Sequence, residues 1–178
     1  GSVTLDDFEL ADAIFVFGQN PGTNHPRMLG ELRRAAKRGC RIVVFNPLRE
    51  RGLERFTDPQ SPAEMLSGGS TAIASHYFQP KIGGDLAVAT GIAKILVERA
   101  DSESDPHALD VAFIVANTHG YDAVADGARD ADWADIKRES GLTRAQLEQA
   151  AQVYLDSNAT ILCWGMGITQ HINGTSTA

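Results

Sequence analysis

The chain has 178 residues, 43% of them hydrophobic, which is enough apolar material for one large domain. Its formal net charge of -7 argues against non-specific binding to nucleic acid, and no apolar run is long enough to span a membrane. No signal peptide opens the chain, and Cys40 and Cys163 each lie in or beside an apolar run. We therefore expect a cytoplasmic protein with buried free thiols, and neither a disulfide nor a metal motif.

The first predicted strand is residues 13–17, a continuous apolar run rich in β-branched and aromatic residues. A short helix should precede it at residues 4–10. A polar loop follows at residues 18–26, and periodic apolar residues predict a helix over 27–38 that ends at Gly39. A loop between the carboxyl end of a parallel strand and a helix is where open α/β sheets bind ligands, and the helix N-terminus favours anions.

This loop is not the dinucleotide fingerprint, because Gly18 and Gly22 lack the spacing of G-x-G-x-x-G. Its polar side chains have two interpretations. They offer hydrogen-bond donors to a ligand, or Thr23 or Asn24 simply caps the helix behind a tight turn. The loop alone leaves both open.

A second buried strand is predicted at residues 41–45, so that the first two strands and their helix form a parallel βαβ unit. The polar loop at 46–52 should lie beside the first loop. The basic residues gathered between 27 and 55 are interpreted as solvated faces. We expect residues 53–70 to be irregular, because they lack periodicity, and a short strand within 71–78. A glycine loop ending in Gly83, Gly84 and Asp85 opens a helix at 86–99.

The second half is predicted to be mostly helical. A polar linker at 101–106 precedes helices at 108–117, 121–127 and 130–139. The next helix should begin with a capping box of Thr143 and Gln146 and end at Asn158. Residues 160–164 predict a third buried strand. The predicted fold class is α/β, a Rossmann-like three-layer αβα domain with a mainly parallel sheet, spanning residues 1–178 as a single domain. The glycine loops after the three strands should share one sheet edge.

Four loops combine glycine with amide or charged side chains before a helix: residues 18–24, 46–49, 83–85 and 165–171. Together they resemble the molybdopterin oxidoreductase family, in particular the formate dehydrogenase-like alpha subunits. Three segments carry the match: Gly18-Gln-Asn-Pro-Gly-Thr-Asn-His-Pro, Ser140-Gly-Leu-Thr with its helix, and Trp164-Gly-Met-Gly-Ile-Thr-Gln-His. The resemblance covers residues 8–174, which correspond to an inner part of the family's large subunit, so we expect a fragment of a longer protein.

The resemblance implies a domain that holds part of a molybdenum bis(molybdopterin guanine dinucleotide) cofactor for two-electron redox chemistry. The metal-ligating residue would then lie upstream, the second half of the cofactor site downstream, and any 4Fe-4S cluster outside this chain. The implied partners are the remaining domains of its own subunit, a small-molecule redox substrate and an electron-transfer partner, with no nucleic acid and no membrane. The fragment alone should be inactive. The alternative is a non-catalytic Rossmann-like nucleotide-binding or regulatory module, which needs fewer loops.

The resemblance also assigns roles within the loops. Asn20 and Thr23 would donate to the pyrophosphate or the pterin, and Met166 and Gln170 would contact the pterin edge on either side of Gly167. No catalytic or metal-ligating residue is expected in the chain. The residues expected to bind the cofactor are Gly18, Asn20, Thr23, Asn24, Asn46, Arg49, Gly84, Asp85, Gly165, Met166, Gly167 and Gln170.

Several of these residues have alternative interpretations. Arg49 either pairs with a phosphate or is a solvated loop charge. Many relatives carry Asp-Pro-Arg where this chain has Asn46-Pro-Leu-Arg49, which leaves the ribose contact open. Asp85 either accepts the two adjacent donors of guanine or caps the following helix. His25 stands at a helix start and is not expected to be a catalytic base, whereas His171 either lines the cofactor or satisfies a core hydrogen bond.

Overall fold

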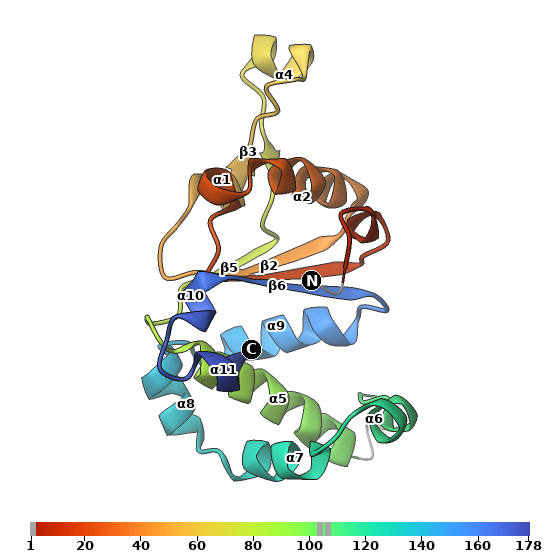
Figure 1. Cartoon of the computed structure of the whole chain (residues 1–178), viewed down its shortest axis with the longest axis vertical. Coiled ribbons are helices and arrows are strands. Elements are labelled where there is room, and N and C mark those ends of the chain that lie inside the picture. Colours follow the sequence, from red (N-terminus) through yellow and green to blue (C-terminus); the bar gives the residue numbers. More distant parts are fainter. Residues whose placement is uncertain (1–2, 103–104, 106–107) are drawn as a thin grey trace. The chain divides into compact units, whose positions relative to one another are not determined.

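The computed structural model describes residues 3–102, 105 and 108–178, and the chain divides into two compact units (Figure 1). The first unit comprises residues 1–79, 156–176 and 178, and the second comprises residues 80–155 and 177. The expectation of a single domain over residues 1–178 stays a prediction.

A parallel sheet forms the centre of the first unit. Its strands are β1 (Ala13–Phe17), β2 (Arg41–Phe45), β5 (His76–Phe78) and β6 (Thr160–Trp164), in the order β5-β2-β1-β6. Each neighbouring pair is parallel. The three strands predicted from apolar runs are confirmed with their bounds, and so are the α/β class and the mainly parallel sheet. The predicted burial of the third strand was wrong, because β6 lies at the edge of the sheet and Leu162 and Trp164 are exposed. β1 reads as a continuous apolar run because Ala13, Ile14, Phe15 and Val16 are all buried.

The two faces of the sheet carry different side chains, as the alternation along each strand requires. One face packs against α2 (Pro26–Arg38), which lies over the sheet in Figure 1 and contributes Leu29, Leu32 and Ala35 to the core. The strand residues of this core are Ile14, Val16, Ile42, Val44 and Ile161. α2 begins one residue before the predicted helix because proline suits the first helical position, and it ends as predicted at Gly39, whose φ is +95°.

Phenylalanine rings stack side by side on the other face of the sheet. The ring centroids of Phe17 and Phe45 are 4.8 Å apart, and those of Phe45 and Phe78 are 5.3 Å apart. Phe15 joins the row at 6.5 Å from Phe45. This row runs across three adjacent strands, β1, β2 and β5, so the aromatic contacts reinforce the pairing of those strands.

The connecting segments contain more regular structure than the sequence predicts. The 3-10 helix η1 (Asp6–Glu9) corresponds to the short helix expected at residues 4–10, and α10 (Met166–Thr169) and α11 (Gly174–Thr177) follow β6. The first loop contains α1 (Pro21–Asn24). Residues 53–70 are not irregular, because they contain the second half of α3 (Arg51–Glu54) and all of β3 (Arg55–Phe56) and α4 (Pro62–Ser67).

Residues 71–78, predicted as one short strand, contain two strands. β4 (Thr71–Ala72) pairs antiparallel with β3, whereas β5 belongs to the main sheet. α4 starts at a proline, and the Ser61 hydroxyl caps it by accepting a hydrogen bond from the Glu64 amide at 3.4 Å. Elements of two to six residues are too short to show a hydrophobic period, which is why the sequence did not reveal them.

The second unit is helical in its described part, with α5 (Asp85–Asp101), α6 (Val111–Asn117), α7 (Tyr121–Asp130), α8 (Trp133–Ser140) and α9 (Arg144–Leu155). The predicted helices are present with shifted ends. Of the linker expected at 101–106, Asp101 belongs to α5, and residues 103, 104 and 106 lie outside the described residues. The capping box before α9 is confirmed, because the Gln146 amide donates to Thr143 Oγ1 at 3.3 Å and the Thr143 amide to Gln146 Oε1 at 2.9 Å. No helix in the described part is long and apolar enough to cross a membrane.

The second unit also buries a charge. Lys94 of α5 is 7% exposed, and its ammonium donates to the carbonyls of Ala128 at 3.2 Å and Arg129 at 2.5 Å, in the last turn of α7. Glu98 lies 3.3 Å away, one turn further along α5. Because the carbonyl end of a helix favours a cation, this arrangement compensates the desolvation of the ammonium and ties α5 to α7.

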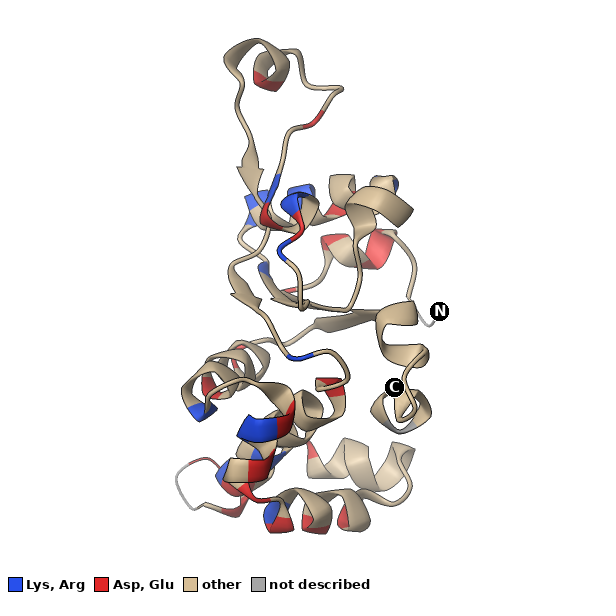
Figure 2. Ribbon diagram, turned by 90° about the vertical axis from the view of Figure 1, so that its left-hand side faces the viewer, with Lys and Arg blue, Asp and Glu red and all other residues tan. Residues whose placement is uncertain are grey.

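An ion-pair cluster links α2 to the segment that carries α4. Arg33 Nη1 lies 3.2 Å from Asp58 Oδ2, and Arg33 also pairs with Glu64, which accepts from Lys37 Nζ at 2.9 Å. Figure 2 shows basic and acidic residues close together around α2 and the neighbouring loops. The hydrogen bond from Arg33, followed by those from the Asp58 amide and Lys37, lowers the pKa of Glu64 from 4.5 to about 2.

We predict that this attachment depends on pH. The folded-state pKa lies below the ordinary value, so ionised Glu64 stabilises the folded state above pH 4.5, and that contribution is lost as the pH falls towards about 2. NMR titration of the side-chain carboxyl groups should find the low value, and Glu64→Gln should remove this part of the pH dependence of unfolding. Glu9→Gln, in η1, is the control. An unchanged pH dependence in Glu64→Gln would contradict the prediction.

Candidate functional site

Three loops begin side by side at one edge of the sheet. The register places the last residues of the three strands, Phe17, Phe45 and Trp164, next to one another, because β1 pairs in parallel with both β2 and β6. The Gly18 amide then donates to the Phe45 carbonyl at 2.9 Å, so the first loop starts in contact with the second strand. The expectation that the loops after these strands share one edge is confirmed.

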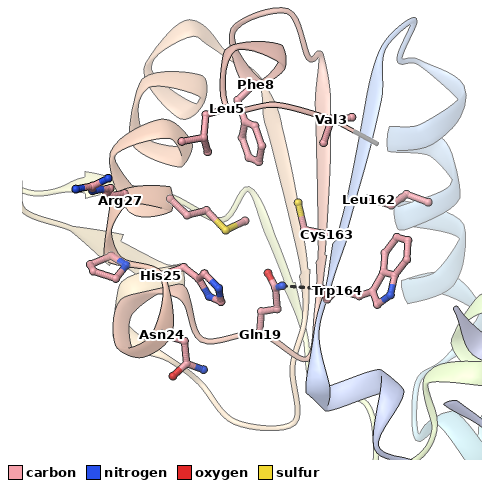
Figure 3. Close-up of a pocket in the computed structure, with 12 residues that line it drawn as sticks. Val3, Leu5, Phe8, Gln19, Asn24, His25, Arg27, Leu162, Cys163 and Trp164 are labelled. Carbon is pink, nitrogen blue, oxygen red and sulfur yellow. Dashed lines mark hydrogen bonds between the residues drawn. The ribbon is translucent and has the colours of Figure 1, made fainter. Parts of the chain in front are cut away.

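The first and third loops touch through their backbones. A β-carbon at Gly167 would lie 2.2 Å from the Gly18 carbonyl oxygen, so no larger residue fits there without moving a loop. Gly18 itself has a φ of +55°, which favours glycine. Gln19 Nε2 donates to the Trp164 carbonyl at 2.8 Å and holds the same two loops together (Figure 3). The glycines that the sequence assigned to ligand approach therefore also permit the contact between loops.

The first and second loops are joined by a buried amide. Asn46 is 7% exposed, and its Nδ2 donates to the Gln19 carbonyl at 3.1 Å while its Oδ1 accepts from the Leu48 amide at 3.1 Å. An ionised aspartate at this position could accept but not donate, so only the amide satisfies both partners. Nearby, a β-carbon at Gly52 would lie 3.3 Å from the Gly22 α-carbon, so α1 and α3 also approach closely.

A polar cavity of about 530 Å³ lies between the first two loops and the β3–β4 ribbon. Asn20 and Thr23 line it from the first loop, Arg51 lines it from the start of α3, and Arg55 lines it from β3. Within the described residues neither arginine forms an ion pair, although Arg55 Nε donates to Ser70 Oγ at 2.8 Å. Two cationic side chains beside an amide and a hydroxyl are chemically suited to a phosphate ester. The lining is completed by Gly22, Leu29, Glu50, Gly52, Phe56, Thr57, Gly68 and Ser70.

A second cavity, of about 770 Å³, is mainly apolar and lies between the start of α2 and β6 (Figure 3). Its apolar lining is formed by Val3, Leu5, Phe8, Pro26, Met28, Leu162, Cys163 and Trp164, and Gln19, Asn24, His25 and Arg27 supply the polar groups. Gln19 Oε1 is buried and has no hydrogen-bond partner among the described residues. Burial raises the pKa of the Cys163 thiol to about 11, so Cys163 is a neutral thiol and a poor metal ligand at neutral pH.

The first loop does not cap α2. The residue before α2 is His25, which makes no side-chain capping bond, whereas Thr23 and Asn24 belong to α1. The capping interpretation of these two residues was therefore wrong. Thr23 lines the polar cavity and Asn24 the apolar one, so the turn of α1 directs neighbouring side chains to different cavities.

Arg49 is neither a free solvated charge nor part of the polar cavity. Its Nη1 lies 2.5 Å from Glu54 Oε1, its Nε donates to Gln79 Oε1 at 3.4 Å, and its guanidinium lies 5.3 Å from the centre of the Tyr77 ring. The third loop presents Met166, which is 66% exposed, and Gln170 donates from Nε2 to the Met166 sulfur at 3.5 Å. Gly165 precedes α10. Half-buried His171 follows this helix, and its amide donates to the Ile168 carbonyl.

The remaining two predicted residues, Gly84 and Asp85, belong to the second unit. A β-carbon at Gly84 would lie 2.7 Å from the Glu139 carbonyl oxygen, so packing within this unit already requires glycine. Gly84 holds the N-cap position of α5, and Asp85, which is 9% exposed, is the first helical residue. Asp85 therefore does not hold the N-cap position that the sequence predicted, and its contact with guanine stays a prediction.

Sequence reasoning missed Arg51, Arg55 and Gln19. The two arginines belong to the basic cluster that was interpreted as solvated. The available signal was the position of Arg51 beside Gly52, at the end of the loop that follows the second predicted strand. Gln19 lies in the middle of the predicted first loop, but its partner Trp164 is 145 residues away in sequence, so no local pattern could reveal the bond.

We predict that Gly167→Ala destabilises the first unit, because the new methyl group would collide with the Gly18 carbonyl; overpacking of this kind costs roughly 1–3 kcal/mol. The matched control is Gly30→Ala in α2, where a β-carbon meets nothing within 4 Å and the change should stabilise by about 0.5–1 kcal/mol. Urea unfolding followed by circular dichroism measures both. Equal stability of the two variants would refute the contact.

Comparison with known proteins shows which family this chain resembles. The family model described as "Molybdopterin oxidoreductase" matches residues 1–178. "Protein YdeP" of Escherichia coli (strain K12) is 48% identical over 98% of this chain and 24% of its own length. "Formate dehydrogenase H" of the same organism is 25% identical over 99% of this chain and 21% of its own. This chain therefore spans less than a quarter of these two relatives.

Among solved structures, "Acetylene Hydratase from Pelobacter acetylenicus" superposes with a TM-score of 0.72 at 17% identity, over 94% of this chain and 20% of that one. This likeness concerns the fold alone. The family match covers the whole chain, including the three loops that meet at the sheet edge. The chain belongs to the molybdopterin oxidoreductase family.

Proposed function

We propose that this chain is a cofactor-binding domain of a formate dehydrogenase-like oxidoreductase, and that it holds part of a molybdenum bis(molybdopterin guanine dinucleotide) cofactor. Family membership supports a molybdenum–pterin cofactor. The observation that carries the more specific proposal is the polar cavity between the first two loops, which Arg51 and Arg55 line without forming an ion pair within the described residues.

The residues present fit the nucleotide end of such a cofactor. Arg51 and Arg55 would neutralise phosphate charge, and Asn20 and Thr23 would hydrogen-bond to phosphate or ribose oxygens. The close approach of Gly22 and Gly52 leaves no side chain at the point where α1 meets α3. When bound, the molybdenum–pterin group supplies the two-electron redox chemistry. This chain's residues bind and orient the cofactor.

No group of three or more histidine, cysteine, aspartate or glutamate residues that could hold a metal ion stands together in the described part of the chain. We propose that the metal ligand and the substrate contacts come from other parts of the whole protein, because this chain spans less than a quarter of the length of these two relatives. Formate is the substrate proposed by analogy with formate dehydrogenase H. A [4Fe-4S] cluster, where present, and the electron-transfer partner belong to the same whole protein.

We predict that Arg51→Gln, made in the full-length protein, lowers bound cofactor roughly tenfold, since a charge-assisted hydrogen bond to phosphate is lost. Pterin fluorescence after oxidative extraction and guanine nucleotide after acid hydrolysis both measure cofactor content. Arg34→Gln is the control, because Arg34 is exposed on α2 and pairs with Glu31. Guanine nucleotide without pterin would favour the nucleotide-binding module instead, and neither compound in the parent protein would refute both functions.

Asp85 gives a second test, of the proposed guanine contact. A carboxylate accepts both adjacent donors of guanine, whereas an amide offers one acceptor to two donors. Asp85→Asn in the full-length protein should therefore unfold like the parent but lose a clear fraction of its bound cofactor. Asp122→Asn, in the first turn of α7, is the matched control. Full cofactor occupancy in Asp85→Asn would rule out the guanine role.

A further inference from the structure

The second loop is held from behind by side chains that do not line the polar cavity. The Tyr77 hydroxyl, on β5, accepts a hydrogen bond from the Glu50 amide at 3.0 Å and donates to the Leu48 carbonyl at 2.7 Å. Gln79 Nε2 donates to the Pro47 carbonyl at 2.9 Å. Two residues of one neighbouring strand segment therefore bind three backbone groups of the loop.

The last residue held by these bonds, Glu50, is also the first residue of the second loop that lines the polar cavity. Glu50 is the N-cap residue of α3, it makes no side-chain capping bond, and its carbonyl accepts the amides of Leu53 and Glu54 at 2.9 and 3.1 Å. Arg51, the first residue of α3, lines the polar cavity. The Tyr77 hydroxyl thus holds the residue directly before Arg51, and its position sets where α3 starts.

The ring of Tyr77 makes a contact that does not depend on its hydroxyl. The Arg49 guanidinium lies 5.3 Å from the ring centre, and Arg49 also pairs with Glu54 in α3. Burial raises the pKa of Tyr77, so the phenol stays protonated and keeps its donor at neutral pH. Tyrosine to phenylalanine therefore removes the two backbone hydrogen bonds and retains the ring that Arg49 covers.

We propose that Tyr77 is a positioning residue for the cofactor site, which fixes residues 48–50 through its hydroxyl and thereby places Arg51 in the polar cavity. The role rests on the proposed function, because the cofactor is the ligand whose binding it would alter. Tyr77 does not line the cavity, so it acts through Arg51 and does not touch the ligand.

Tyr77→Phe in the full-length protein tests this proposal. We expect cofactor to dissociate about three- to tenfold faster than from the parent, the range for one hydrogen bond or two weak ones. A double-mutant cycle with Arg51→Gln separates positioning from general destabilisation. If Tyr77 acts through Arg51, Tyr77→Phe has little further effect once Arg51 is replaced. Tyr121→Phe, at the start of α7 in the second unit, controls for loss of a tyrosine hydroxyl.

A second readout does not require the cofactor. Hydrogen exchange of the Glu50 amide should be faster in Tyr77→Phe than in the parent, while exchange of the Gly18 amide, which is bonded to Phe45, stays unchanged. Parental cofactor dissociation in Tyr77→Phe, or effects additive with Arg51→Gln, would overturn the proposal. If the parent protein binds no cofactor, the proposed function fails by itself. In that case hydrogen exchange of the Glu50 amide still tests whether Tyr77 holds the loop. An exchange rate in Tyr77→Phe equal to that of the parent would overturn this role of Tyr77.

Discussion

The close approach of the Gly18 and Gly167 backbones is the constraint on which the site depends. The first loop and the third loop follow adjacent parallel strands. Where they touch, a β-carbon at residue 167 would collide with the Gly18 backbone. A larger residue there would separate the loops and break the bond from Gln19 to the Trp164 carbonyl. The parallel register brings the loop starts together, and the glycines allow the loops to remain in contact.

Side chains around the loops divide into two groups with different tasks. Asn46, Gln19, Tyr77 and Gln79 bond to backbone atoms of the loops and hold them in place. Thr23, Arg51 and Arg55 instead line the polar cavity. Such a division is what a preorganised binding site needs, because the ordering of the loops is complete before a ligand arrives.

Charge pairing distinguishes the arginines of the first unit in the same way. Arg33 and Arg49 are held by carboxylates, and their contacts attach α4 to α2 and stabilise the second loop. Arg51 and Arg55 form no ion pair within the described residues, so their charge is available to an anion. The net charge of the chain is -7, so its overall field does not favour anions, and any attraction of an anion to this cavity would be local.

The sequence by itself determined the elements whose signals are local. The three strands at residues 13–17, 41–45 and 160–164, the stop at Gly39 and the capping box of Thr143 and Gln146 all follow from runs, periods and caps within a few residues. It also determined that the three loops share one sheet edge, since that follows from parallel pairing.

Only the tertiary structure decided how individual loop residues are used. Asn46 bonds to Gln19, 27 residues away, and Gln19 bonds to Trp164, 145 residues away, so neither task has a local pattern. Arg49 and Arg51 are two positions apart, yet Arg49, which precedes α3, pairs with Glu54 and lies near the Tyr77 ring, whereas Arg51, the first residue of α3, lines the polar cavity. Short helices such as α1 depend on packing more than on propensity, because a single turn is not stable alone. Local patterns predicted which sheet edge carries the candidate site, and long-range packing decides which side chains face its cavities and which hold the loops together.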